Sequence, residues 1–149
     1  MLNITTGKIQ KPVKALVYGP EGIGKTTFAS KFPKPLFIDT EDGSGHLDVA
    51  RVDKPSSWSM LRGIVEELTK NPQGYQTLVI DTADWADRLA IAEICAKGDE
   101  KGSKSCIEDF GYGKGWVRLA DEWKRFLDQL AELQAKQGIS ILLLAHATM

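Results

Sequence analysis

The chain has 149 residues, a formal net charge of −1 at pH 7, 42% hydrophobic residues and 26% charged residues. This composition is typical of a globular protein, and the length fits one domain with a substantial core. The near-zero net charge excludes attraction of nucleic acid or membranes by the overall field, so any such contact needs a local patch.

Cysteine use and hydropathy favour a reducing compartment. The two cysteines, Cys95 and Cys106, lack the spacing of a metal site, and free or buried thiols suit a reducing cytoplasm. The first residues lack the apolar core of a signal peptide, and no run approaches the length of a membrane span. We therefore expect a cytoplasmic protein that makes no contact with membranes.

The strongest local signal is a phosphate-binding loop. Residues 19–26 fit the pattern G-x-x-x-x-G-K-[ST], in which glycines bring successive N–H groups onto an anion. An apolar strand over residues 13–18 and a short helix over residues 26–32 supply the required strand–loop–helix order. The pattern predicts that Lys25 reaches the β- and γ-phosphates of ATP and that Thr26 places its hydroxyl on Mg²⁺. The expected nucleotide contacts are Gly19, Pro20, Glu21, Gly22, Ile23, Gly24, Lys25, Thr26 and Thr27.

The strand that is expected after the P-loop helix ends in carboxylates. Residues 35–39 form a short apolar run that leads into an acidic turn with Glu41, and a weak alternation over residues 46–53 suggests an edge strand. A helix follows from Ser57 to Asn71. Carboxylates at the C-terminal end of a strand stand where open α/β sheets gather their ligand groups. A solvated acidic turn is the alternative for Glu41.

Residues 77–81 form the second decisive segment, because an apolar strand that ends in Asp81 fits the Walker B pattern. In that pattern the aspartate supports the bound Mg²⁺. The pattern is weak alone and strong when a phosphate-binding loop precedes it. A helix is expected to follow this strand and to end at Lys97.

Residues 98–115 make a long, glycine-rich connection that we expect to be a mobile loop. Aromatic and basic side chains on such a loop fit a binder of single-stranded nucleic acid. A surface loop without a ligand is the alternative. The candidate DNA contacts are Lys101, Lys104, Tyr112 and Lys114.

The C-terminal part predicts a long amphipathic helix over residues 116–137 that packs on the sheet, and a central strand over residues 139–145. His146 follows that strand, where a γ-phosphate sensor would stand. A structural histidine is the alternative.

The order of elements predicts an α/β fold, a doubly wound parallel sheet with helices on both faces. By analogy with P-loop proteins, we expect the last strand between the P-loop strand and the Walker B strand.

The segments G-P-E-G-I-G-K-T-T-F-A, F-I-D-T-E-D-G, T-L-V-I-D-T and S-C-I-E-D-F-G-Y-G-K-G-W resemble the phage-encoded RecA/RadA-like ATPases, known as phage nucleotide-binding proteins. Some members of that family act in single-strand annealing or recombination. The resemblance extends from about Val13 to the end of the chain. The P-loop and Walker B segments indicate only an NTPase, and residues 107–116 are the segment that points to this family. It implies a single RecA-like ATP-binding core over residues 1–149, with a lead-in over residues 1–12. RecA-like cores continue into further strands, so we expect C-terminal strands beyond residue 149.

The resemblance also implies roles for individual residues. Glu41 matches the glutamate that polarises the attacking water, Lys25 binds phosphate, and His146 takes the place of the γ-phosphate sensor. Thr26 and Asp81 are implied as the Mg²⁺ site, and residues 98–115 fall where RecA-like proteins carry a DNA-binding loop. The implied partners are ATP, single-stranded DNA and a phage or host replication or recombination protein. A homo-oligomer of the full-length protein in the host cytoplasm is implied as well.

Other functions are possible for a P-loop protein. A GTPase would carry an N-K-x-D segment, and the sequence has none. A small-molecule kinase would need an arginine-rich lid, whereas the five arginines are scattered: Arg51, Arg62, Arg88, Arg118 and Arg125. A nucleotide-dependent adaptor or loader for a replication protein is the alternative outside catalysis.

Overall fold

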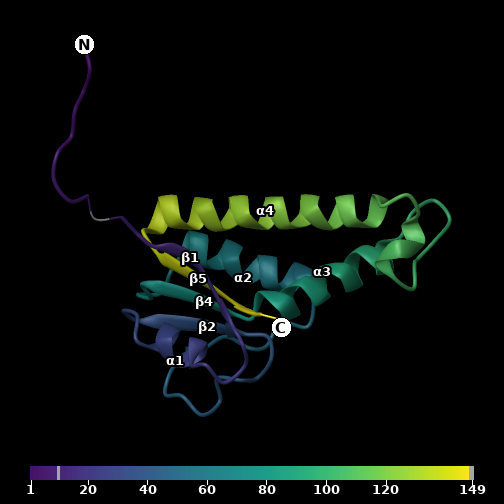
Figure 1. Cartoon of the computed structure of the whole chain (residues 1–149), viewed down its shortest axis with the longest axis horizontal. Helices are drawn as coiled ribbons and strands as arrows, with labels where there is room; N and C mark the ends of the chain where they lie inside the picture. Colours follow the sequence, from purple (N-terminus) through teal and green to yellow (C-terminus); the bar gives the residue numbers. More distant parts are fainter. Residues whose placement is uncertain (10, 148–149) are drawn as a thin grey trace.

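The computed structural model describes residues 1–9 and 11–147. The chain forms an α/β domain in which strands and helices alternate (Figure 1). The elements are β1 (Lys14–Gly19), α1 (Lys25–Ser30), β2 (Pro35–Asp39), β3 (Ala50–Arg51), α2 (Trp58–Lys70), β4 (Thr77–Asp81), α3 (Ala83–Lys97), the 3₁₀ helix η1 (Ile107–Phe110), α4 (Lys114–Gln137) and β5 (Ser140–His146).

All five strands run parallel in the order β1-β5-β4-β2-β3. The last strand therefore lies between the P-loop strand and the Walker B strand, which confirms the predicted topology. The register pairs Gly19 with His146 and Asp39 with Asp81. Because parallel strands end at the same edge of a sheet, the functional candidates that end or follow β1, β2, β4 and β5 are gathered there.

Helices cover both faces of the sheet, as predicted. Helix α1 lies on one face, and α2, α3 and α4 lie on the other (Figure 1). Side chains alternate between the two layers, since Leu36 and Ile38 belong to the core under α2 to α4 whereas Phe37 belongs to the core under α1. Strands that are buried on both faces have nearly continuous apolar sequences, which explains the sequences of β2 and β4.

The prediction that the long helix packs on the sheet is only partly right. Helix α4 lies chiefly against α2 and α3 and also touches β5. Its buried residues Leu119, Phe126, Leu130 and Leu133 follow helical spacing. Aromatic packing joins it to α2, where the fully buried Trp58 ring lies 5.0 Å from the Phe126 ring.

Residues 98–115 have defined local structure. Asp99 and Gly102 form an antiparallel bridge, and the 3₁₀ helix η1 buries Ile107 and Phe110. At the start of α4, Gly115 packs so closely that a Cβ there would lie 2.1 Å from the carbonyl oxygen of Ile107. This contact fixes η1 against the first turn of α4. Whether the segment moves in solution stays a prediction.

None of the helices within residues 1–9 and 11–147 is both long enough and apolar enough to cross a membrane.

Gly115→Ala is expected to lower the melting temperature, because the added methyl group meets the Ile107 backbone. Overpacking of this kind costs about 1–3 kcal/mol. Gly63→Ala is the matched control, since a Cβ at Gly63 in α2 would have nothing within 4 Å. That change should stabilise the fold by about 0.5–1 kcal/mol, as glycine is unfavourable inside helices. Thermal unfolding of both variants checks the pair, and a Gly115→Ala protein as stable as the wild type would contradict the packing described.

Candidate nucleotide-binding site

A hollow of about 350 Å³ opens at the C-terminal edge of the sheet. Its walls come from the P-loop, the turn after β2, and the ends of β4 and β5. The residues that line it are Glu21, Gly22, Gly24, Lys25, Thr26, Thr27, Glu41, Gly43, His46, Asp81 and His146. Most of the residues that the sequence predicts for the site are thereby brought together.

The P-loop has the backbone that its glycines permit. Gly22 and Gly24 have φ values of +80° and +100°, in the left-handed region that favours glycine. Lys25 is 8% exposed, and its ammonium group donates to the carbonyl oxygens of Gly19 at 2.8 Å and Pro20 at 3.0 Å. Lys25 therefore lies along the loop, with its charge at the loop's own carbonyl groups. Ile23 is exposed, and its side chain covers Gly19.

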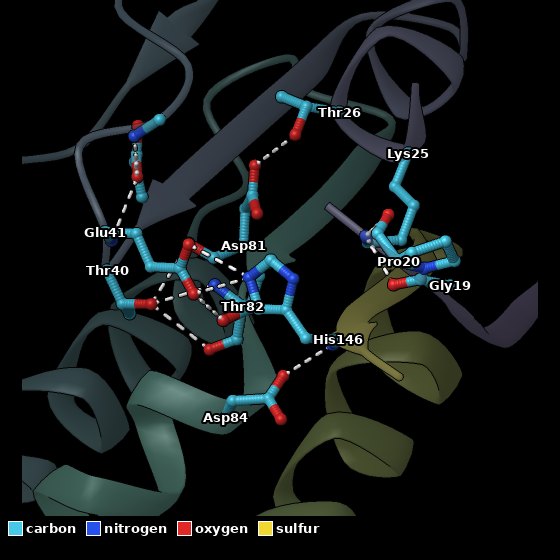
Figure 2. A network of polar contacts seen from close by, with 12 residues as sticks. Gly19, Pro20, Lys25, Thr26, Thr40, Glu41, Asp81, Thr82, Asp84 and His146 are labelled. Carbon is cyan, nitrogen blue, oxygen red and sulfur yellow. Dashed lines mark hydrogen bonds and ion pairs between the residues drawn. The ribbon is translucent and has the colours of Figure 1, made fainter. Parts of the chain in front are cut away.

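Thr26 and Asp81 lie in direct contact. The Thr26 hydroxyl donates to Asp81 Oδ2 at 2.8 Å, which joins α1 to the end of β4 (Figure 2). Hydroxyl and carboxylate oxygens are hard donors of the kind that Mg²⁺ prefers. Within the described ranges, no group of three or more His, Cys, Asp or Glu side chains could hold a metal ion alone. This donor set fits Mg²⁺, which usually takes one or two protein ligands together with substrate phosphates.

The environment of Asp81 raises the pKa of its carboxyl group. Burial raises the pKa of Asp81 above its ordinary value, and the carboxylates of Asp39 and Glu41 act in the same direction. The hydrogen bond from Thr26 and the charge of His146 oppose that rise. A cation at Asp81 would favour the ionised form, so binding of a metal there should release a proton wherever the acid is still neutral.

Glu41 contacts Thr82, which follows β4, and His146, the last residue of β5 (Figure 2). His146 Nε2 is 3.0 Å from Glu41 Oε1 and 3.1 Å from Oε2, and the Thr82 hydroxyl donates to Oε1. The main chain of His146 is fixed in turn, because its N–H donates to the Asp84 carboxylate at 2.8 Å. The side chains of Glu41 and His146 are 20% and 31% exposed, so both remain accessible from the hollow.

The turn that carries Glu41 is organised by Asp39. The Asp39 carboxylate accepts the N–H groups of Glu41 at 3.1 Å, Gly43 at 3.1 Å and Ser44 at 2.7 Å, and also the Ser44 hydroxyl. Burial alone would raise the pKa of Asp39, but these hydrogen bonds outweigh it and hold the pKa below its ordinary value. Arg51 of β3 donates to the hydroxyl and carbonyl oxygens of Ser44. Asp39 thus serves the structure, whereas Glu41 faces the hollow.

A second hollow of about 430 Å³ adjoins the first beyond the pair of Glu41 and His146. Trp85, at the start of α3, lines it together with Glu21 and Ala147. The Arg88 guanidinium lies 4.3 Å from the centre of the Trp85 ring. The first hollow is therefore open on this side.

The four candidate DNA contacts do not lie at the hollow. They belong to residues 98–115, which connect α3 to the first turn of α4 and lie at the opposite end of α3 from Asp81 (Figure 1). Lys101, Tyr112 and Lys114 are exposed. Lys104 is different, because its side chain is 11% exposed and its ammonium group lies 2.9 Å from the Asp99 carboxylate. That geometry does not favour a role for Lys104 in binding DNA.

Several residues of the site were not identified from the sequence. Gly43 and His46 line the hollow, and Thr40, Thr82 and Asp84 hold the residues around it. One signal was available, since Ile-Asp-Thr occurs twice, at residues 38–40 and 80–82. In both triplets the aspartate is the last residue of a strand, at the C-terminal edge of the sheet.

Comparison with known proteins places the chain in a family. A family model described as an AAA domain matches residues 11–149. The chain belongs to this family of P-loop NTPases. The match confirms the predicted P-loop NTPase and agrees with the α/β fold described above. It is a match to the broad family, and the RecA-like recombination type stays a prediction.

A relative comes from a prophage. The chain is similar to the SPbeta prophage-derived uncharacterized protein YorG of Bacillus subtilis (strain 168), with 25% identity over 135 residues. The aligned region covers 88% of this chain and 40% of that relative, so the chain spans less than half of the relative's length. The similarity agrees with the predicted resemblance to phage proteins.

Asp39→Asn is expected to lower the free energy of unfolding at pH 7 by about 1–3 kcal/mol, because buried donors lose a charged acceptor. Since the pKa of Asp39 is lowered in the folded state, its contribution is complete above the unfolded value of about 3.9 and is lost as the pH falls through the folded value. The difference from wild type should therefore shrink below about pH 4.

Urea denaturation at pH 7 and at about pH 3 measures this difference. The exposed Asp48 of the same turn is the control, and Asp48→Asn should change stability by less than about 0.5 kcal/mol. Equal losses for the two variants at pH 7 would contradict the role given to Asp39.

Proposed function

We propose that the protein binds ATP with Mg²⁺ and hydrolyses it by in-line attack of water on the γ-phosphate. The observation that carries the proposal is the meeting of Lys25, Thr26, Asp81 and Glu41 around one hollow. Phosphoryl transfer needs mainly positioning and charge stabilisation, and these are the group types that supply both.

In the proposed reaction the P-loop N–H groups and Lys25 hold the phosphate oxygens. Lys25 leaves the carbonyl oxygens of Gly19 and Pro20 to do so, exchanging neutral acceptors for charged ones. Thr26 and Asp81 hold Mg²⁺, which would neutralise phosphate charge as a Lewis acid. Glu41 orients the attacking water, and His146 senses the γ-phosphate from the end of β5. Groups that are fixed before the reaction stabilise the developing charge without reorganising.

We further propose that hydrolysis is slow in the isolated monomer and that full-length protein forms a homo-oligomer. In RecA-like assemblies a neighbouring subunit supplies a cation to the site. The hollow leaves room for such a group, since it continues past Glu41 and His146 into the second hollow. Among the described residues that line the two hollows there is no arginine, and Lys25 is the one lysine.

The proposed biological role is in phage DNA recombination or single-strand annealing. The resemblance of residues 107–116 and the prophage-derived relative support this role. Tyr112 is fully exposed, as a stacking side chain would be. Helix α3 begins two residues after Asp81 and ends where the candidate DNA segment begins, so it offers a connection between the two sites. Nucleotide state would then alter the grip on single-stranded DNA.

An adaptor or loader for a replication protein is the second candidate. The charge of residues 98–115 favours it, because this segment has three lysines against four carboxylates and Lys104 is paired with Asp99. Such a segment attracts a polyanion weakly. A kinase for small molecules is less favoured, because none of the described residues that line the hollow is an arginine.

ATP turnover with and without single-stranded DNA tests the proposal, with Lys25→Ala as the control. We expect DNA to stimulate hydrolysis in the wild type, and Lys25→Ala to lose hydrolysis by at least about 100-fold, because the phosphate charge then lacks its cation. Nucleotide binding without stimulation by DNA would favour the adaptor. Turnover that survives in Lys25→Ala would contradict the assigned ATP site.

A further inference from the structure

Two threonines occupy equivalent places at the functional edge of the sheet. Thr40 and Thr82 each follow a strand-ending aspartate, and the parallel register pairs those aspartates with each other. Both threonines are almost fully buried, at 3% and 1% exposure. Buried hydroxyl groups require hydrogen-bond partners, so what these two contact shows what they do.

Thr40 fixes the main chain of Thr82. The N–H of Thr40 donates to the carbonyl oxygen of Asp81 at 2.8 Å, and the N–H of Thr82 donates to the Thr40 hydroxyl at 2.8 Å. The same hydroxyl lies 3.0 Å and 3.1 Å from the carbonyl oxygens of Asp81 and Thr82, and its proton can serve one of them at a time. These contacts hold residue 82 on both sides of its Cα.

Thr82 returns the contact through its side chain. Its hydroxyl donates to Oε1 of Glu41, the residue after Thr40, so the two strand ends are joined in both directions (Figure 2). A glutamate side chain has three rotatable bonds, and a fixed donor removes much of that freedom. Because Thr82 also follows Asp81, one short segment fixes the proposed metal-binding carboxylate and the proposed water-orienting carboxylate together.

Within residues 1–9 and 11–147, the hydroxyl of Thr82 makes no hydrogen bond other than the one to Glu41. Thr82 is the N-cap residue of α3, a place where a threonine side chain usually accepts a backbone N–H of the first turn. Here its side chain makes no such capping bond. The helix therefore does not depend on this hydroxyl, which serves Glu41 instead.

We propose that Thr82 is a positioning residue for Glu41, holding Oε1 so that the carboxylate keeps one orientation toward the attacking water. The inference rests on the proposed function, in which Glu41 orients that water. Thr82 therefore affects the chemical step of hydrolysis, whereas the P-loop binds ATP.

The test compares Thr82→Val, which keeps the shape and removes the hydroxyl, with Thr82→Ser, which keeps the hydroxyl. We expect Thr82→Val to lower kcat for ATP by about 10- to 100-fold, because small misplacements of a catalytic group are costly. KM for ATP should change by less than about twofold, and Thr82→Ser should recover most of kcat. Melting temperatures show whether each variant is folded, and Thr82→Ala replaces the valine variant if valine disturbs the fold.

Single-turnover hydrolysis by Glu41→Gln and by the double variant separates the possible failures. If Thr82 acts through Glu41, Thr82→Val has no further effect in the Glu41→Gln protein. Losses that add in the double variant, or a valine variant as active as the wild type beside an inactive Glu41→Gln, would overturn the role of Thr82. Full hydrolysis by Glu41→Gln would instead overturn the proposed catalytic role of Glu41.

Discussion

The parallel register of β1, β5, β4 and β2 is the constraint from which the candidate site follows. It sets Gly19 beside His146 and Asp39 beside Asp81, so groups that are distant in sequence lie at one edge. The central strands are buried on both faces, and a shift by one residue would exchange the two buried faces, which makes the register hard to alter. The hydrogen bond from Thr26 to Asp81 then ties the P-loop helix to this edge.

Three carboxylates crowd the edge and are separated by their partners. Asp39 accepts hydrogen bonds from its own turn, which lower its pKa and commit it to the fold. Asp81 is buried with fewer donors, which raises its pKa and suits it to a cation. Glu41 is held by Thr82 and His146 and faces the hollow. One cluster thus provides a structural anion, a proposed metal ligand and a proposed catalytic residue.

The P-loop, the strand-ending Asp81 and the place of β5 could be predicted because each depends on a local pattern and on general rules of sheet topology. The contacts of Thr40 and Thr82 could not, because they depend on which residues the register sets side by side. The pairing of Lys104 with Asp99 was missed for a similar reason, since the antiparallel bridge at Asp99 closes within a segment predicted as a loop. The sequence of helix α4 predicted an apolar face, but the spacing of apolar residues does not determine whether helices or strands cover that face.

A crystal structure with Mg²⁺ and a slowly hydrolysed ATP analogue tests the central claim most directly. The account predicts that the triphosphate lies along residues 22–27, that Lys25 has left the carbonyl groups of Gly19 and Pro20, and that Thr26 and Asp81 face the metal. The terminal phosphate should face Glu41 and His146. A nucleotide bound elsewhere on the molecule, or a terminal phosphate remote from Glu41, would contradict the assignment of this edge as the site of ATP hydrolysis.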